Sequence, residues 1–192
     1  MPASRPQELK YILPTFLKTA KKSQSRYPSL IVYIRSCRKV FDEKFRKGLE
    51  KYEIKGKVIS QQDDSELMLY IYSLAKLALC KSGTVNMELA LYGIPQIIGY
   101  KVSRVTAFIA KRILNFKVRF ISPVNLLMKK LIIPEFVQKN FNEKKIFYKA
   151  CRLLDLTSEK AKIKKGYSLL RKELGEEGVV DRAAKEIINS II

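Results

Sequence analysis

The sequence of 192 residues contains no histidine and no tryptophan, and it has only three cysteines. The missing histidine excludes Ser–His and Cys–His catalysis and any histidine-ligated metal site within this chain. Cys37, Cys80 and Cys151 are far apart and lack the spacing of metal ligands. We therefore expect reduced cysteines that serve as small core residues in a cytoplasmic protein.

Long apolar runs and acidic residues are also scarce. No apolar run approaches the roughly 20 residues that a membrane-spanning helix needs, so we expect any membrane contact to be peripheral. The chain has 38 Lys and Arg against 18 Asp and Glu, a net charge of +20, and no acid between Leu89 and Pro134. This positive charge favours an anionic partner. The three candidate classes are nucleic acid, a lipid surface and a phosphorylated substrate.

Size and patterning predict one well-buried α/β domain. Short apolar segments of strand length occupy residues 30–37, 57–60, 77–80, 95–100 and 118–121. They alternate with helical patterns, which predicts a Rossmann-like parallel sheet with helices on both faces and right-handed crossovers. Ligands of such sheets bind at the carboxyl ends of the strands.

The first helix is expected to begin with Ser4 as its cap and Pro6 in its first turn. Its apolar face comprises Leu9, Ile12, Leu13, Phe16 and Leu17. Further helices are expected at residues 39–52, 63–75 (capped by Asp63 or Asp64), 85–93 and 105–116, with three more in 142–192, separated near Thr157 and at 175–178. The helix at 105–116 is amphipathic and basic, so it either covers the sheet or lies on an anionic lipid surface.

The stretch of residues 77–101 predicts a strand, a turn, a helix that presents Val85, Leu89 and Tyr92 on one face, and a second strand. Ser82, Gly83 and Thr84 form the turn, where small residues let a ligand approach the backbone and the first N–H groups of the helix attract phosphate. Glu88 lies one turn further, where its carboxylate can accept hydrogen bonds from ribose hydroxyls. An ordinary helix cap followed by a solvated acid is the alternative interpretation.

Two other polar residues fall at turns of the same edge. Arg5 stands at a helix start, where a cation opposes the helix dipole unless it faces a bound anion; an exposed arginine is the alternative. Asn125 follows Pro123 in a polar loop after the expected strand at 118–121. Its amide can bind a base or a phosphate, or it can cap a turn.

Four segments carry a resemblance to a known family: PASRPQE, KSGTVNMELALYGIPQIIGYK, SPVNLL and IIPEFVQ, in this order. Together they resemble the successive signature segments of lipid-A-disaccharide synthase, a glycosyltransferase with the two-domain GT-B fold. The similarity covers nearly the whole chain but only the C-terminal half of the family. The resemblance implies one UDP-sugar-binding domain, with an α/β core at 1–140 and C-terminal helices at 141–192. The part that resembles the family does not include the family's N-terminal acceptor domain.

The resemblance implies an inverting hexosyltransferase that moves 2,3-diacylglucosamine from UDP-2,3-diacylglucosamine to 2,3-diacylglucosamine 1-phosphate. The products are the β-1,6-linked lipid A disaccharide precursor and UDP, and no metal or other cofactor is needed. Carried over from the family, Ser4, Arg5 and residues 82–84 bind the diphosphate. Glu88 accepts hydrogen bonds from the ribose hydroxyls. Asn125 contacts the nucleotide, and Glu8 and Tyr100 complete the expected UDP-sugar site.

The resemblance leaves the catalytic base outside this chain, because the family's carboxylate base belongs to its N-terminal domain. We therefore expect the chain alone to be inactive, as a fragment, a mis-started frame or one half of a split enzyme. Expected partners are an anionic membrane surface, on the cytoplasmic face of the bacterial inner membrane, and a second copy of the chain or a separate N-terminal half.

Two positions depart from the family pattern, and two other functions compete with the resemblance. Ala3 replaces a usual glycine, and Lys81 replaces a small residue, so Lys81 either contacts phosphate or points to solvent. One competitor is a different UDP-sugar transferase of the GT-B fold, such as the peptidoglycan enzyme. The other is a non-catalytic, basic nucleic-acid-binding domain, although no helix-turn-helix, zinc or RNA-sheet signature is present.

Overall fold

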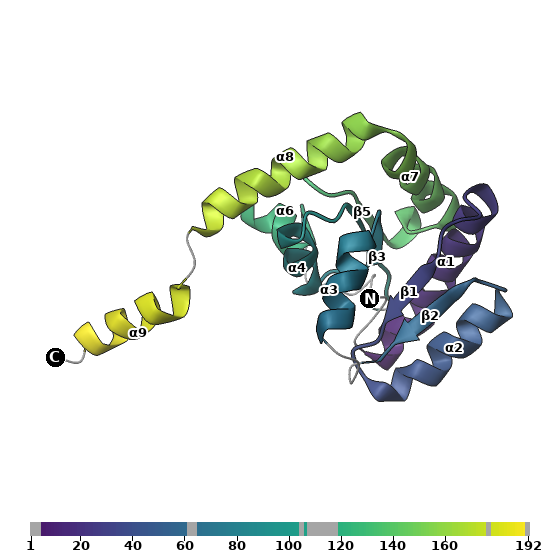
Figure 1. Ribbon diagram of the computed structural model, residues 1–192, viewed down its shortest axis with the longest axis horizontal. Coiled ribbons are helices and arrows are strands. Elements are labelled where there is room, and N and C mark those ends of the chain that lie inside the picture. Colours follow the sequence, from purple (N-terminus) through teal and green to yellow (C-terminus); the bar gives the residue numbers. More distant parts are fainter. Residues whose placement is uncertain (1–4, 61–64, 104–105, 107–118, 176–177, 191–192) are drawn as a thin grey trace.

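The computed structural model describes residues 5–60, 65–103, 106, 119–175 and 178–190, and these residues alternate between helices and short strands (Figure 1). The elements of the first part of the chain are α1 Pro6–Arg26, β1 Val32–Arg35, η1 Lys39–Phe41, α2 Asp42–Lys51, β2 Gly56–Ile59, α3 Ser65–Leu74, β3 Ala78–Cys80, α4 Val85–Leu91 and β4 Gln96–Tyr100. Those of the second part are α6 Pro123–Leu127, β5 Glu135–Val137, η2 Gln138–Asn140, α7 Glu143–Asp155, α8 Thr157–Leu174 and α9 Val179–Asn189. The α/β fold expected from the alternating pattern is confirmed.

All strand pairs in the described part of the chain are parallel, but they form two hydrogen-bonded sheets. β1 pairs with β2, while β4 lies between β3 and β5. In the larger sheet Leu79 is opposite Ile97 and Gly99 is opposite Phe136. β4 is the most buried strand, as expected for a central strand of a parallel sheet.

The strand predicted at residues 118–121 is wrong for its described part, because residues 119–121 are not in a strand. The backbone N–H groups of Ile121 and Ser122 donate to the carboxylate of Glu135, at 2.8 and 2.9 Å, rather than to a neighbouring strand. Val118 lies outside the described residues. Strand β5, which the sequence did not predict, occupies the outer position beside β4.

Helix α1 joins the cores that form on the two sheets. The predicted apolar face is confirmed: Leu9, Leu13 and Leu17 pack in a cluster with α2 and β1, whereas Ile12 and Phe16 pack in the larger cluster around β3 and β4. Figure 1 shows α1 between α7 and the β1–β2 sheet, in agreement with its contacts to α7 and α2. The helix therefore fixes the two sheets relative to each other.

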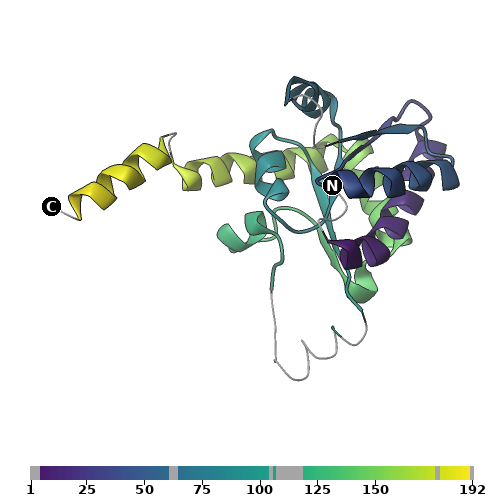
Figure 2. The same ribbon diagram turned by 90° about the horizontal axis from the view of Figure 1, so that it is seen from below.

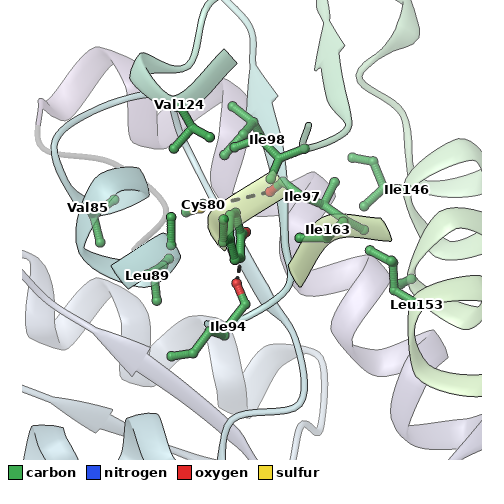
Figure 3. Packing of buried hydrophobic residues seen from close by; sticks show 14 of the residues in the cluster. Cys80, Val85, Leu89, Ile94, Ile97, Ile98, Val124, Ile146, Leu153 and Ile163 are labelled. Atoms are coloured by element: carbon green, nitrogen blue, oxygen red, sulfur yellow. Dashed lines mark hydrogen bonds between the residues drawn. The ribbon is translucent and has the colours of Figure 1, made fainter. Parts of the chain in front are cut away.

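The larger core surrounds β3 and β4 (Figure 3). Cys80 is fully buried among Val85, Leu89, Ile97 and Ile98, which confirms its expected place in the core. Cys37 and Cys151 are only partly buried, and none of the three cysteines, all of which the structure describes, forms a disulfide. Tyr92, expected on the buried face with Val85 and Leu89, is instead 52% exposed, because α4 ends at Leu91.

The three helices expected after residue 142 are confirmed as α7, α8 and α9. α8 closes the core through Ile163, Tyr167 and Leu170, and the Tyr167 hydroxyl donates to the carbonyl of Ile94 at 3.0 Å. α9 lies apart from the other elements in both views (Figure 1, Figure 2). Among the described helices, none has the length and apolar character required to cross a bilayer.

Some expectations fall outside the described residues. These are the Ser4 cap, the caps Asp63 and Asp64, and, apart from Thr106, the amphipathic helix at 105–116. Within the described part, the residue at the N-cap position of α1 is Arg5.

Gly99 gives a test of the packing between β4 and the helices that cover it. A Cβ atom at this position would lie 2.1 Å from Phe141 Cε2 and 2.8 Å from Phe16 Cζ, and both rings are buried. We expect Gly99→Ala to lower the free energy of unfolding by about 1–3 kcal/mol through overpacking. Urea unfolding measures this loss.

The matched control is Gly83→Ala, because a Cβ at Gly83 would meet only Lys81 Cε, at 3.9 Å. We expect this variant to stay within about 0.5 kcal/mol of the unmodified chain. Equal losses in the two variants would contradict the packing of β4 described here.

Candidate functional site

The start of α1 is tied to the turn after β3 by a partly buried ion pair. Lys81 Nζ lies 2.9 Å from Glu8 Oε2, and the two side chains are only 18% and 11% exposed. Glu8 also accepts a hydrogen bond from the backbone N–H of Arg5, at 3.2 Å. The expectation that Lys81 points to solvent is therefore wrong: Lys81 pairs with Glu8 and links the turn to the segment that carries Arg5.

The same turn also contacts the segment before α6. Ser82 Oγ donates a hydrogen bond to the carbonyl of Ile121. Three chain segments thus lie together beyond the carboxyl end of β3: residues 5–8, 81–84 and 121–125, which we call the three-segment rim. Tyr100 ends β4 and packs, partly buried, against the larger core cluster.

The β3–α4 turn is shaped by Asn86, which is fully buried. Asn86 Oδ1 accepts from the backbone N–H of Gly83 at 3.0 Å, and Nδ2 donates to the carbonyl of Lys81 at 3.0 Å. Among the described residues, none accepts a hydrogen bond from the N–H groups of Thr84 and Val85. These two groups, rather than that of Gly83, are therefore the turn donors left for an anion.

Glu88 is held from two other elements. Arg35 Nη1, at the end of β1, lies 2.8 Å from Glu88 Oε1 and 2.9 Å from Oε2. The Tyr72 hydroxyl of α3 lies 3.1 Å from Oε1. Burial raises the pKa of Tyr72 to about 12, so the hydroxyl keeps its proton at neutral pH. It therefore donates a hydrogen bond to Glu88.

Asn125 is fully buried, and it lies in the short helix α6 rather than in the loop that the sequence predicted. Its Nδ2 donates to the carbonyl of Ile133 at 2.8 Å and to Glu135 Oε1 at 2.7 Å, while its Oδ1 accepts from the N–H groups of Ile132 and Ile133. The amide therefore holds the chain between α6 and β5. A direct contact with a nucleotide would require these bonds to break.

The remaining predicted residues lie on the rim with different exposure. Arg5 is exposed, Thr84 is exposed at the N-cap of α4, and Ser82 and Gly83 are partly buried. Ser4 lies outside the described residues. In the part of the chain that the structure describes, no three His, Cys, Asp or Glu side chains gather in a group able to hold a metal ion.

Sequence reasoning missed four residues that shape this region: Arg35, Tyr72, Asn86 and Glu135. Two of them had a usable signal. Arg35 ends a predicted strand and so belongs to the carboxyl edge of a parallel sheet. Glu135 is the first acid after Glu88 and stands within an apolar run. Tyr72 and Asn86 had none, because each follows the ordinary pattern of its helix.

A family model described as lipid-A-disaccharide synthetase matches residues 1–192. The chain is 46% identical over 189 residues to a lipid-A-disaccharide synthase of Prochlorococcus marinus, an alignment that covers 98% of this chain and 48% of the relative. It is 36% identical over 191 residues to the synthase of Gloeothece citriformis, covering 100% of this chain and 48% of the relative. The synthase of Synechocystis sp. is 35% identical over 188 residues, which is 98% of this chain and 47% of the relative. The chain thus spans about half the length of the curated relatives it matches.

Asn125→Ala tests the role of the buried amide. The change leaves the N–H groups of Ile132 and Ile133 and the carbonyl of Ile133 without this partner. We expect the free energy of unfolding to fall by about 2–4 kcal/mol, measured by urea unfolding. The control is Asn142→Ala, which removes a partly exposed N-cap of α7 and should cost about 1 kcal/mol. Equal losses would contradict the structural role of Asn125.

Proposed function

The chain belongs to the lipid-A-disaccharide synthetase family, and we propose that it forms the UDP-sugar-binding part of such a glycosyltransferase. The full reaction is the inverting transfer of 2,3-diacylglucosamine from UDP-2,3-diacylglucosamine to 2,3-diacylglucosamine 1-phosphate. The observation that carries this proposal is the three-segment rim, because three of the four segments that resemble the family contribute to it. A rim beyond the carboxyl end of β3, a strand of a parallel sheet, suits a nucleotide.

The proposed diphosphate site comprises Ser4, Arg5 and the turn at 82–84, with the N–H groups of Thr84 and Val85 as donors. Glu88 is proposed to accept from the ribose. Glu8 acts indirectly, since its pair with Lys81 holds Arg5 beside the turn. Tyr100, at the carboxyl end of β4, lies at the same edge of the larger sheet. For Asn125 we propose support of the nucleotide loop rather than a contact through its amide.

The proposed chemistry needs no metal ion or other cofactor. Negative charge grows on the diphosphate as UDP departs, so a fixed cation and fixed N–H donors stabilise the transition state more than the ground state. Arg5 and the turn donors provide these groups. The acceptor site and the general base are assigned to the family's N-terminal domain, supplied by a separate half or as part of a longer chain.

We also propose that the protein acts at the cytoplasmic surface of the inner membrane, as a peripheral protein. The end of α6 and the segment after it expose Leu126, Leu127 and Leu131, which are 50%, 43% and 61% exposed, beside the exposed Lys129 and Lys130. Exposed leucines flanked by lysines suit an anionic lipid surface, where the acyl chains of the sugar donor and of the sugar acceptor would be held. A second copy of the chain is a further proposed partner.

Titration with UDP tests the diphosphate site. We expect Arg5→Ala to weaken UDP binding by about tenfold, as for the loss of one charge-assisted contact, and to leave the weaker binding of uridine unchanged. Isothermal titration calorimetry measures both ligands. The control is Arg46→Ala, because Arg46 is another exposed arginine with only a weak contact to Glu43. A chain that fails to bind UDP, or an equal effect of the two substitutions, would overturn the proposed site.

Reconstitution tests the proposed reaction. We expect no disaccharide from the chain alone with both acylated substrates, and turnover once the N-terminal half of a lipid-A-disaccharide synthase is added. Thin-layer chromatography of radiolabelled product measures the transfer. The added half assayed alone is the control. If the mixture forms no disaccharide, the split-enzyme version is wrong.

A further inference from the structure

The carboxylate of Glu88 is already engaged from two sides. Arg35 reaches it from the end of β1 and Tyr72 from α3, so three elements meet at one side chain. The Arg35 guanidinium also lies over the Tyr72 ring, 5.9 Å from its centroid, and the Tyr72 ring lies 5.1 Å from that of Tyr92. The orientation of Glu88 is therefore set by packed neighbours rather than by solvent.

The contacts of Glu88 leave it able to accept a further hydrogen bond. Arg35 Nη1 lies 2.8 Å from Oε1 and 2.9 Å from Oε2 and also donates to the Tyr72 hydroxyl at 2.5 Å, so its two hydrogens are shared among three acceptors. The Tyr72 hydroxyl in turn lies 3.1 Å from Oε1. An ionised carboxylate has about four acceptor positions, and the Glu88 side chain is 38% exposed, so a ligand is able to reach it.

We propose that Arg35 and Tyr72 are positioning residues that hold the Glu88 carboxylate in the orientation in which it accepts a hydrogen bond from the ribose. This inference rests on the proposed UDP site. Arg35 fixes Glu88 through a charge-assisted contact to both oxygens, and the Tyr72 hydroxyl adds a contact to Oε1. The ribose then meets an acceptor that is oriented before binding, which lowers the entropy lost on binding.

The same chemistry occurs on another face of the protein and gives a matched control. Arg26 Nη2 lies 3.2 Å from Asp155 Oδ2, and the Tyr27 hydroxyl lies 2.6 Å from Asp155 Oδ1. This arginine–tyrosine–carboxylate group joins α1 to α7, outside the three-segment rim. If Arg35 and Tyr72 served only to stabilise the fold, substitutions in the two groups should have the same effect on ligand binding.

The test measures UDP affinity by isothermal titration calorimetry on the full chain. We expect Arg35→Gln and Tyr72→Phe each to weaken UDP binding by about threefold to tenfold, and Arg26→Gln and Tyr27→Phe to leave it unchanged. In the Glu88→Ala background, Arg35→Gln should change the affinity by less than about twofold, because both residues act through one carboxylate. Equal weakening in the two backgrounds would overturn the positioning role.

Two further results separate this inference from the proposed function. A chain that does not bind UDP contradicts both. A chain that binds UDP, responds to Glu88→Ala and ignores both Arg35→Gln and Tyr72→Phe contradicts the inference alone. Thermal unfolding checks each variant, and Tyr72→Phe, which removes only a hydroxyl, serves as the test if Arg35→Gln does not fold.

Discussion

Parallel strand direction is the constraint on which the candidate site depends. Because parallel strands end at the same edge of their sheet, the turn after β3 and Tyr100 of β4 emerge on one side. Arg35 ends β1 on the side where its side chain meets Glu88. Of the three segments of the rim, only residues 81–84 follow a described strand; residues 5–8 and 121–125 join them through the contacts of Lys81 and Ser82. Strand direction places the polar residues near one another, but it does not orient them.

Orientation comes from a few polar contacts between segments that are distant in the sequence. Lys81 reaches Glu8 across 73 positions, and Arg35 reaches Glu88 across 53. Glu135 holds the backbone of Ile121 and Ser122, and Asn125 completes the same loop. Partly buried pairs of this kind add little net stability, because desolvation offsets much of the Coulomb attraction. Their effect here is to fix the geometry of the three-segment rim.

The helices and most strands were predictable because their signals are local. Leu9 to Leu17 follow the helical period, and the apolar runs at β1, β2, β3 and β4 have strand length. Strand β5 was missed because its three residues begin with an acid, Glu135, directly after Pro134, whereas the equally short β3 is apolar throughout. Residues 119–121 have a sequence suited to a strand but form none. The backbone N–H groups of Ile121 and Ser122 donate to Glu135 instead of to a neighbouring strand. A tertiary contact overrode the local preference there.

Candidate site residues could be nominated by type and position, but not by their partners. The small residues at 82–84 and the acid at 88 have the chemistry of a nucleotide turn, whereas the partners of Lys81 and Glu88 depend on how α1, β1 and α3 pack. Asn125 shows the limit: an amide after a strand suits a ligand and a loop equally well. Only the structure shows that its four hydrogen bonds are directed into the protein.

The central claim is that the three segments of the rim together bind one uridine diphosphate molecule. Amide chemical shifts of the isotopically labelled chain, recorded by NMR during a UDP titration, test it most directly. The account predicts that the largest shifts arise together, with one dissociation constant, at residues 5–8, 81–88 and 121–125. Shifts confined to α7, α8 and α9, or separate dissociation constants for the three segments, would contradict it.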